Sequence, residues 1–202
     1  MTTRYASPTR RLGLLPANGR TEKPTRGPYR YAAGDRIAGD LTITGHLAEG
    51  RVGHLYQVWS ASEWCSFTCK ILAPEKRGER APIAALRREA HILTSARHPN
   101  LVQCFGGGEH EGLPFILLEY LEGPSLFDLL EDSPRRRLEV SDAVRTSIHL
   151  AAAVHHLHRK GYLHLDLKPA NLLLRDSIPV LIDLDTARRV AGRRPGSRMG
   201  TA

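Results

Sequence analysis

The stretch YLHLDLKPANLLL, residues 162–174, places three polar side chains between apolar runs. Asp166, Lys168 and Asn171 fall within six residues of one another. A carboxylate, an ammonium or an amide that is buried without a partner costs several kcal/mol. A plain core segment therefore gains nothing from this set. These side chains either face solvent in a loop or converge on a charged ligand.

The next stretch, NLLLRDSIPVLIDLD at residues 171–185, adds a second acidic position. Two apolar runs flank the turn-like RDSIP, which predicts an antiparallel hairpin. With Leu173 opposite Leu181, Asn171 lies opposite Asp183, and two oxygen ligands meet at one end of the hairpin. Mg²⁺ takes one or two such ligands and completes its octahedron with phosphate oxygens and water. A nearby lysine supplies a mobile positive charge, so the stretch predicts a magnesium–phosphate site.

These two stretches resemble the catalytic loop and the magnesium motif of protein kinases. HLDLKPAN is similar to HRDLKPxN, and DLD stands where the family has DFG. Upstream, AEGRVGHLY resembles the glycine-rich phosphate loop, FTCKIL the third-strand lysine segment and LRREAHIL the helix with its glutamate. RHPNLVQCFGG, LLEYLEGPSL and the terminal GTA also follow the family order. The resemblance covers residues 37–202.

The resemblance implies an α+β, protein-kinase-like bilobal fold with a β-rich N-lobe and an incomplete helical C-lobe. Residues 1–33 are rich in Pro, Gly, Thr and Arg without periodicity, which predicts a disordered basic extension. The resemblance makes residues 34–118 the N-lobe, and residues 119–202 the hinge and a partial C-lobe that ends in the activation segment. Apolar patterning agrees with this division. Short β-type runs surround one helical stripe at residues 81–97 in the first half, and the second half reads as helical.

Two helices are predicted in the second half. SLFDLLED begins at Ser125, a favourable N-cap residue. SDAVRTSIHLAAAVHHLHRKG has Ser141 as a candidate cap, and Gly161 stands where a left-handed residue ends a helix. The histidines of this helix point in different directions at their spacing, which argues against a tetrahedral metal site.

Site roles follow from the resemblance. Lys70 would bind the α- and β-phosphates with Glu89 as its ion-pair partner, or the two would form an ordinary surface ion pair worth under about 1 kcal/mol. The catalytic residues it implies are Asp166, Lys168, Lys70 and Glu89, where Asp166 orients the acceptor hydroxyl and Lys168 steadies the γ-phosphate. The metal ligands it implies are Asn171 and Asp183, with Asp185 as an alternative ligand.

The resemblance also implies a nucleotide site. Backbone N–H groups of the glycine-bearing loop would cover the phosphates, and apolar side chains would enclose the adenine next to the hinge backbone. The ATP-binding residues it implies are Leu47, Gly50, Gly53, Leu55, Thr68, Lys70, Leu118, Glu119, Leu121 and Leu173.

The function implied is ATP-dependent phosphorylation of serine or threonine on a protein substrate, with ATP and Mg²⁺ as cofactors, and Lys168 favours the serine/threonine type. Two alternatives stay open. Leu165 replaces the arginine of HRD and Asp185 the glycine of DFG, which favour a pseudokinase acting as a nucleotide-binding or interaction module. The Asp-x-Asp pattern also resembles aminoglycoside and choline kinases, which phosphorylate small molecules. Ala48, at the first loop glycine, should weaken nucleotide binding only modestly.

Composition limits the remaining function classes. The chain of 202 residues carries a net charge of +8, with basic residues gathered at both ends. No aromatic residues interleave with the second basic cluster and no zinc-finger spacing occurs, so a specific nucleic-acid partner is not predicted. No apolar run is long enough to span a membrane. The N-terminal residues favour a flexible tail over a transit peptide. Three cysteines without a CxxC pair fit the reducing cytoplasm: Cys65, Cys69 and Cys104.

The chain ends at Ala202, before the family's Ala-Pro-Glu segment and the helices that bind peptide. We therefore expect the helix at 141–161 to expose apolar residues such as Ile148 and Ala152. An exposed apolar face of this kind predicts instability, aggregation or a partner that covers it.

Overall fold

The structure is a computed structural model that describes residues 30–133 and 135–190. Most of the predicted basic extension lies outside the described residues, as do the arginines at 193–198 and the terminal Gly-Thr. Tyr31, at the end of that extension, is buried and meets Tyr56 edge-on with 5.8 Å between ring centroids. The described fold therefore includes residues before position 34.

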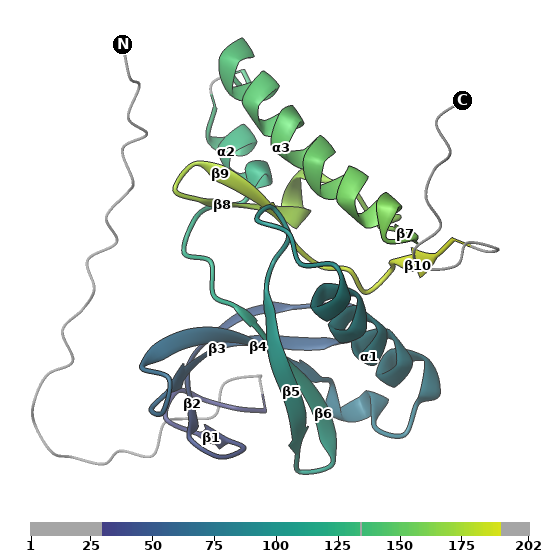
Figure 1. Cartoon of the computed structure of the whole chain (residues 1–202). Helices are drawn as coiled ribbons and strands as arrows, with labels where there is room; N and C mark the ends of the chain where they lie inside the picture. The colour runs from purple at the N-terminus through teal and green to yellow at the C-terminus, as the bar shows by residue number, and fades with distance from the viewer. Residues whose placement is uncertain (1–29, 134, 191–202) are drawn as a thin grey trace, which may run out of the picture.

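The first half forms a six-stranded antiparallel sheet in the order β1-β2-β3-β4-β6-β5 (Figure 1). Alternating burial along β3 reflects the two faces of a strand. In β4 every residue from Phe67 onward is buried, so both of its faces are covered. The strands are β1 (Arg36–Ile37), β2 (Leu41–Glu49), β3 (Gly53–Ser60), β4 (Cys65–Leu72), β5 (Cys104–His110) and β6 (Leu113–Glu119).

Helix α1 (Arg80–Ser95) follows a short 3-10 turn, η1 (Pro74–Lys76), and packs against β4, β5 and β6. Its buried face comprises Ala85, Leu86, Glu89, Ile92 and Leu93, which recur at the spacing of one helical stripe. Glu89 therefore lies in the middle of an apolar face. A carboxylate in that position requires a cation beside it.

The described part of the second half contains two helices and two small two-stranded sheets, and Figure 1 shows it grouped at one end of the molecule with the six-stranded sheet and α1 at the other. This is an incomplete bilobal arrangement. Its elements are α2 (Leu126–Asp132), α3 (Val140–Arg159), β7 (Tyr162–Leu163), η2 (Pro169–Asn171), β8 (Leu172–Arg175), β9 (Ile178–Leu181) and β10 (Arg188–Arg189). Strands β8 and β9 pair with each other, and β10 pairs with β7.

The predicted caps have different outcomes. Ser125 caps α2 through a capping box, in which its Oγ accepts the N–H of Asp128 and Asp128 accepts the N–H of Ser125. Gly161 follows α3 with φ +83°, as predicted. The cap at Ser141 is wrong, because α3 begins at Val140 with Glu139 as its N-cap residue. Ser141 is already inside the first turn, where its backbone is helical and its hydroxyl cannot take the capping position.

The predicted register of the β8–β9 hairpin is also wrong, by one residue. Leu172 pairs with Leu181 and Leu173 with Val180, so Asn171 is opposite Ile182, whose N–H donates to the Asn171 carbonyl at 2.9 Å. The cause is the turn. Its two central residues, at 176 and 177, have φ of +49° and +67°, which makes a two-residue hairpin loop that sets the pairing.

A short segment after α1 connects the sheet to this hairpin. Asn100 donates from Nδ2 to the Pro179 carbonyl at 2.8 Å, and its own carbonyl accepts the N–H of Leu181 at 2.8 Å. Val102 donates to the Leu181 carbonyl at 3.0 Å. These bonds hold β9 beside the segment at residues 100–102, and so they fix the position from which the chain continues to Asp183.

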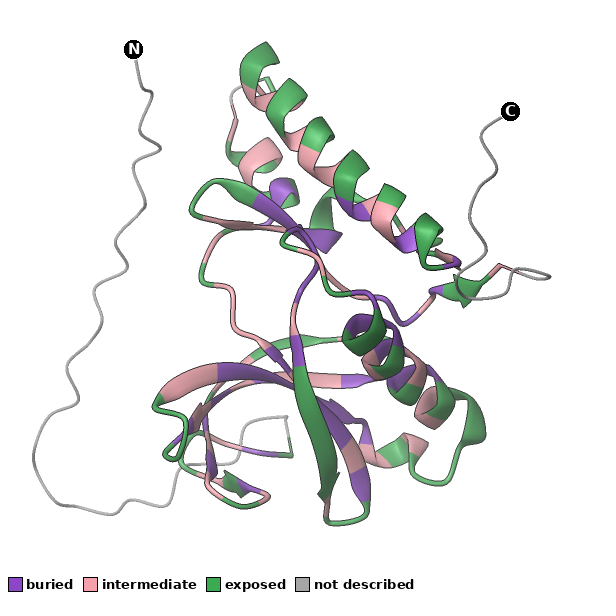
Figure 2. Ribbon diagram, viewed as in Figure 1, coloured by how far each residue is buried: buried purple, intermediate pink, exposed green. Residues whose placement is uncertain are grey.

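Helix α3 exposes an apolar face, as the sequence predicts. Val140, Val144 and Ile148 are exposed, while Ala153 and Leu157 on the opposite face are buried (Figure 2). Ala152 is exposed as well. Within the described residues, no helix is long and apolar enough to cross a bilayer.

Candidate active site

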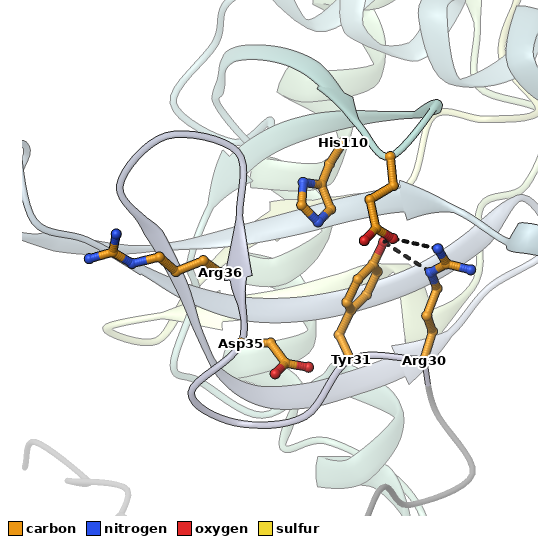
Figure 3. Close-up of a pocket in the computed structure, with 6 residues that line it drawn as sticks. Arg30, Tyr31, Asp35, Arg36 and His110 are labelled. Atoms are coloured by element: carbon orange, nitrogen blue, oxygen red, sulfur yellow. Dashed lines mark hydrogen bonds and ion pairs between the residues drawn. The ribbon is translucent and has the colours of Figure 1, made fainter.

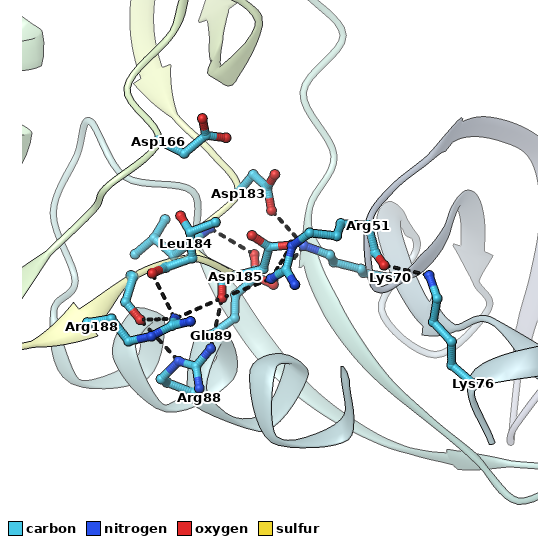
Figure 4. Close-up of polar contacts among 12 residues, drawn as sticks. Arg51, Lys70, Lys76, Arg88, Glu89, Asp166, Asp183, Leu184, Asp185 and Arg188 are labelled. Carbon is cyan, nitrogen blue, oxygen red and sulfur yellow. Dashed lines mark hydrogen bonds and ion pairs between the residues drawn. The ribbon is translucent and has the colours of Figure 1, made fainter. Parts of the chain in front are cut away.

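Lys70 lies at the centre of a buried ionic cluster (Figure 4). Its Nζ is 2.8 Å from Oε2 of Glu89 on α1 and 2.8 Å from Oδ1 of Asp183, which follows β9. The side chains of Lys70 and Glu89 are 4% and 0% exposed. The pair is therefore no surface ion pair, and it joins β4, α1 and the hairpin end.

Burial and charge oppose each other at Lys70. Burial by itself lowers the pKa of the ammonium, but the charges of Glu89 and Asp183 outweigh it and leave the pKa of Lys70 raised. Burial raises the pKa of Glu89, against the opposing effect of Lys70. Lys70 is thus a permanent cation beside Asp183, whose side chain is 33% exposed.

The backbone at Asp183 is held in an unfavourable conformation. Its φ is +59°, a region that residues other than glycine rarely occupy. The contact with Lys70 on one side and the Leu184 N–H donated to Oε1 of Glu89 at 3.1 Å on the other side hold this geometry. Such backbone conformations cluster at functional sites, where surrounding contacts over-determine them.

The loop that begins at residue 164 forms a second cluster. Oδ2 of Asp166 accepts from Lys168 Nζ at 2.7 Å and from Asn171 Nδ2 at 3.0 Å. The hydrogen bond from Lys168 lowers the pKa of Asp166, so its carboxylate stays ionised at neutral pH. Both described hydrogen bonds of the Asn171 side chain use Nδ2, which leaves the amide oxygen for a cation.

His164 fixes this loop to the residues before Asp183. Its Nδ1 accepts the N–H of Asp166 at 3.3 Å, and its Nε2 lies 3.3 Å from the Ile182 carbonyl. These partners require the neutral tautomer with the proton on Nε2, and burial lowers the pKa of His164 in the same sense. Leu165, where the resemblance expects arginine, is 62% exposed with φ +68°.

The glycine-bearing loop joins β2 and β3. Gly50 donates to the Gly53 carbonyl at 2.8 Å, which closes the loop. A side chain at Gly53 would meet the Ile71 carbonyl at 1.9 Å, so close packing against β4 requires glycine there. Packing therefore requires glycine at position 53, whether or not the loop binds phosphate.

Four of the predicted nucleotide-binding residues share one face of the sheet. Leu55 pairs with Lys70, and Thr68 pairs with Leu118. Directly paired residues of antiparallel strands point to the same side, as do residues two apart on one strand. The other residues predicted to bind the nucleotide lie elsewhere on the sheet or outside it.

Leu47 on β2 is 43% exposed. Glu119, the last residue of β6, uses its N–H toward the Gln103 carbonyl and its carboxylate toward Arg175. Leu121 follows β6 and is half-buried, and Leu173 on β8 is bridged to Ser125.

Three arginines that the sequence motifs do not assign to the site surround Asp185. Arg51 lies 3.3 Å from its carboxylate, Arg88 donates to its carbonyl at 2.9 Å, and Arg188 reaches the same carbonyl at 3.4 Å. The sequence contains two signals that place arginines near the site: Arg51 stands between the loop glycines, and Arg88 immediately precedes Glu89.

A polar cavity of about 420 Å³ on the sheet shares no lining residue with this site (Figure 3). Within it Arg30 pairs with Glu111, Tyr31 donates to the same carboxylate at 3.4 Å, and Asp35 accepts the Ala32 N–H. Its charges are thus largely satisfied by the chain itself.

Comparison with known proteins identifies the family. The family model described as protein kinase domain matches residues 41–202. The chain belongs to the protein kinase family. Serine/threonine-protein kinase ppk22 of Schizosaccharomyces pombe is 28% identical over 181 residues, covering 86% of this chain and 34% of that protein. Myosin light chain kinase 3 of Rattus norvegicus is 29% identical, covering 78% of this chain and 20% of that protein.

Solved kinase domains share the fold of this kinase-family chain. The Mycobacterium tuberculosis PknI kinase domain superimposes with a TM-score of 0.66 at 23% identity, covering 80% of this chain and 66% of that one. Another kinase domain reaches a TM-score of 0.73 at 18% identity, covering 86% of this chain and 58% of that one. The chain thus spans a fifth to a third of the length of these curated relatives and about two thirds or less of these structures.

Proposed function

We propose that this chain carries the ATP-binding and catalytic residues of a serine/threonine protein kinase that transfers a phosphoryl group from Mg²⁺-ATP to a protein hydroxyl. The observation that carries the proposal is the position of Lys70, which contacts Glu89 and Asp183 at 2.8 Å each. A lysine held between two carboxylates, one of them a third exposed to solvent, suits anionic phosphates and a divalent cation. Residues 119–202 would then be the hinge and part of the C-lobe, with residues 34–118 as the N-lobe.

The donor set supports magnesium as the metal. Asp183 offers a partly exposed carboxylate, and Asn171 offers an amide oxygen. Mg²⁺ needs only one or two such oxygens from the protein, because phosphates and water fill its other positions. When bound, the ion would neutralise charge that develops on the transferred group.

The remaining residues would position the reactants. Asp166 stays ionised through its bond to Lys168 and can accept the proton of a serine or threonine hydroxyl. Lys168, half exposed beside it, can move to the terminal phosphate. Leu55, Thr68 and Leu118 present one face of the sheet to the adenine, with backbone groups of Glu119 and Leu121 at its edge.

A phosphate-transfer assay with radiolabelled ATP tests this function. Lys70→Met and Asp166→Asn should each abolish incorporation into a serine- or threonine-bearing protein. Arg145→Gln is the matched control, because within the described residues the Arg145 guanidinium pairs with Asp142 on the same helix, α3. This variant should retain full activity. Incorporation that survives both site variants would refute the proposal.

A pseudokinase is the second candidate, and Leu165 and Asp185 favour it. Leu165 extends into solvent and replaces an arginine, and Asp185 is paired with Arg51. Thermal stabilisation by Mg²⁺-ATP without phosphate transfer would support that candidate. An acceptor panel containing aminoglycosides and choline tests the small-molecule alternative, which relies on Asp185 as a metal ligand.

A further inference from the structure

Asp185 replaces a glycine of the family motif, and its carboxylate is buried. Its side chain is 4% exposed, whereas that of Asp183, two residues earlier, is 33% exposed. A buried carboxylate is stable in ionised form only beside a cation or strong hydrogen-bond donors. The identity of that cation therefore indicates the role of Asp185.

The cation is Arg51 from the glycine-bearing loop. Its Nη2 lies 3.3 Å from Oδ2 of Asp185 and 3.4 Å from the Asp185 carbonyl. Within the described residues, no other lysine or arginine nitrogen lies within ion-pair distance of this carboxylate. Arg88 and Arg188 reach the backbone carbonyl instead.

This contact connects the two lobes across the proposed phosphate site. Arg51 belongs to the loop between β2 and β3, and Asp185 follows β9, 134 positions later in the chain. Figure 4 shows the Arg51 side chain directed toward Asp185. The arginine side chain is 59% exposed, whereas the aspartate side chain is 4% exposed.

We propose that Arg51 and Asp185 form a latch, meaning an ion pair that ties the loop at residues 50–53 to the segment after Asp183. The latch holds the loop over Lys70 until the phosphates of an entering nucleotide replace Asp185 as the partner of Arg51. A guanidinium binds phosphate oxygens at least as well as a single carboxylate oxygen, which permits this exchange. The role in nucleotide entry rests on the proposed function, whereas the ion pair does not. Asp185 thereby serves as a positioning residue for Arg51 and not as a magnesium ligand.

Hydrogen exchange in the nucleotide-free full chain tests the latch directly. Asp185→Asn keeps the side-chain size without the charge, and Arg51→Gln removes the other partner. Each should raise amide exchange of the loop about two- to five-fold, the scale expected for a partly exposed ion pair. Glu49→Gln is the matched control, since it removes an acidic charge next to the loop without touching Asp185. The strands β5 and β6 serve as an internal reference and should exchange as in the wild type.

Nucleotide binding tests the exchange of partners. With a fluorescent ATP analogue and no magnesium, Asp185→Asn should raise the association rate about two- to five-fold, in step with loop opening. Arg51→Gln should weaken binding of ATP relative to adenosine, because the phosphates lose a partner. Adenosine, which has no phosphate, should bind the two variants alike.

The outcomes separate the latch from the proposed function. Unchanged loop exchange in both variants overturns the latch, and raised exchange with an unchanged association rate overturns its role in nucleotide entry. A loss of Mg²⁺ affinity in Asp185→Asn with unaltered loop exchange overturns it in favour of a metal ligand. If no form binds nucleotide, the proposed function fails, while loop exchange still decides whether the latch exists.

Discussion

Replacing Lys70 with methionine removes the cation that two carboxylates share. Glu89 is 0% exposed and keeps one described partner besides Lys70, the Leu184 N–H at 3.1 Å. Removing one member of a buried ion pair costs about 3–5 kcal/mol. We expect about 3 kcal/mol, the lower end of that range, because Asp183 is 33% exposed and water can solvate it. Glu89 alone is left as an uncompensated buried charge.

The loss should depend on pH with a definite sign. In Lys70→Met, burial holds the pKa of Glu89 above its unfolded value with no cation to oppose it. A group with a raised folded pKa adds stability below its unfolded pKa, and that stability is lost as pH rises through the folded pKa. The deficit of the variant relative to the wild type should therefore grow as pH rises above the unfolded pKa of glutamate, about 4.3.

Urea denaturation of four chains measures this effect: wild type, Lys70→Met, Glu89→Gln and the double variant. Glutamine keeps an oxygen for the Leu184 N–H without the charge, so the double variant should recover about 2 kcal/mol of the loss. Arg145→Met breaks an exposed pair and should change the free energy of unfolding by under about 1 kcal/mol. Two results would contradict a buried, uncompensated charge at Glu89. One is a loss of unfolding free energy below about 1 kcal/mol in Lys70→Met. The other is a loss in the double variant equal to that in Lys70→Met.

Three further predictions use other features of the chain. Ser125→Ala should lower the free energy of unfolding by about 1 kcal/mol, because it removes the capping box of α2, whereas Ser141→Ala should have little effect; equal losses in urea titrations would contradict this. The wild type should lose stability as pH falls below about 6.5, because burial lowers the pKa of His164 and the unfolded chain takes up the proton first. His164→Gln should flatten that slope, and an unaltered slope would assign the pH dependence elsewhere. Burial raises the pKa of the Cys69 thiol to about 12, so iodoacetamide at neutral pH should label Cys65 first, as followed by mass spectrometry; preferential labelling of Cys69 would show that β4 opens.

Much of the site is readable from sequence because its parts are local. The stretch at residues 162–174 is recognisable by polar residues between apolar runs, and the resemblance of LRREAHIL to a short family motif assigns Glu89. The capping box at Ser125 is likewise a short-range signal. Each of these depends on residues a few positions apart, where spacing alone determines which side chains share a face.

The hairpin register and the α3 cap are predicted wrongly because their local sequence patterns are compatible with more than one geometry. Symmetry about RDSIP suggested one hairpin register, but the left-handed backbone at residues 176 and 177 selects another. Ser141 has the chemistry of a cap, yet α3 begins one residue earlier. The hairpin register and the first residue of α3 both depend on backbone angles, and the residue types nearby allow more than one set of such angles.

The set of charged groups and the order of the kinase motifs along the chain can be read from the amino-acid sequence. The pairing of those charges follows from the folded chain: Lys70 pairs with both Glu89 and Asp183, and Arg51 pairs with Asp185 across 134 positions. Burial explains the difference. An ion in water needs no particular partner, whereas an ion removed from water must be matched by whatever the packing of strands and helices brings beside it.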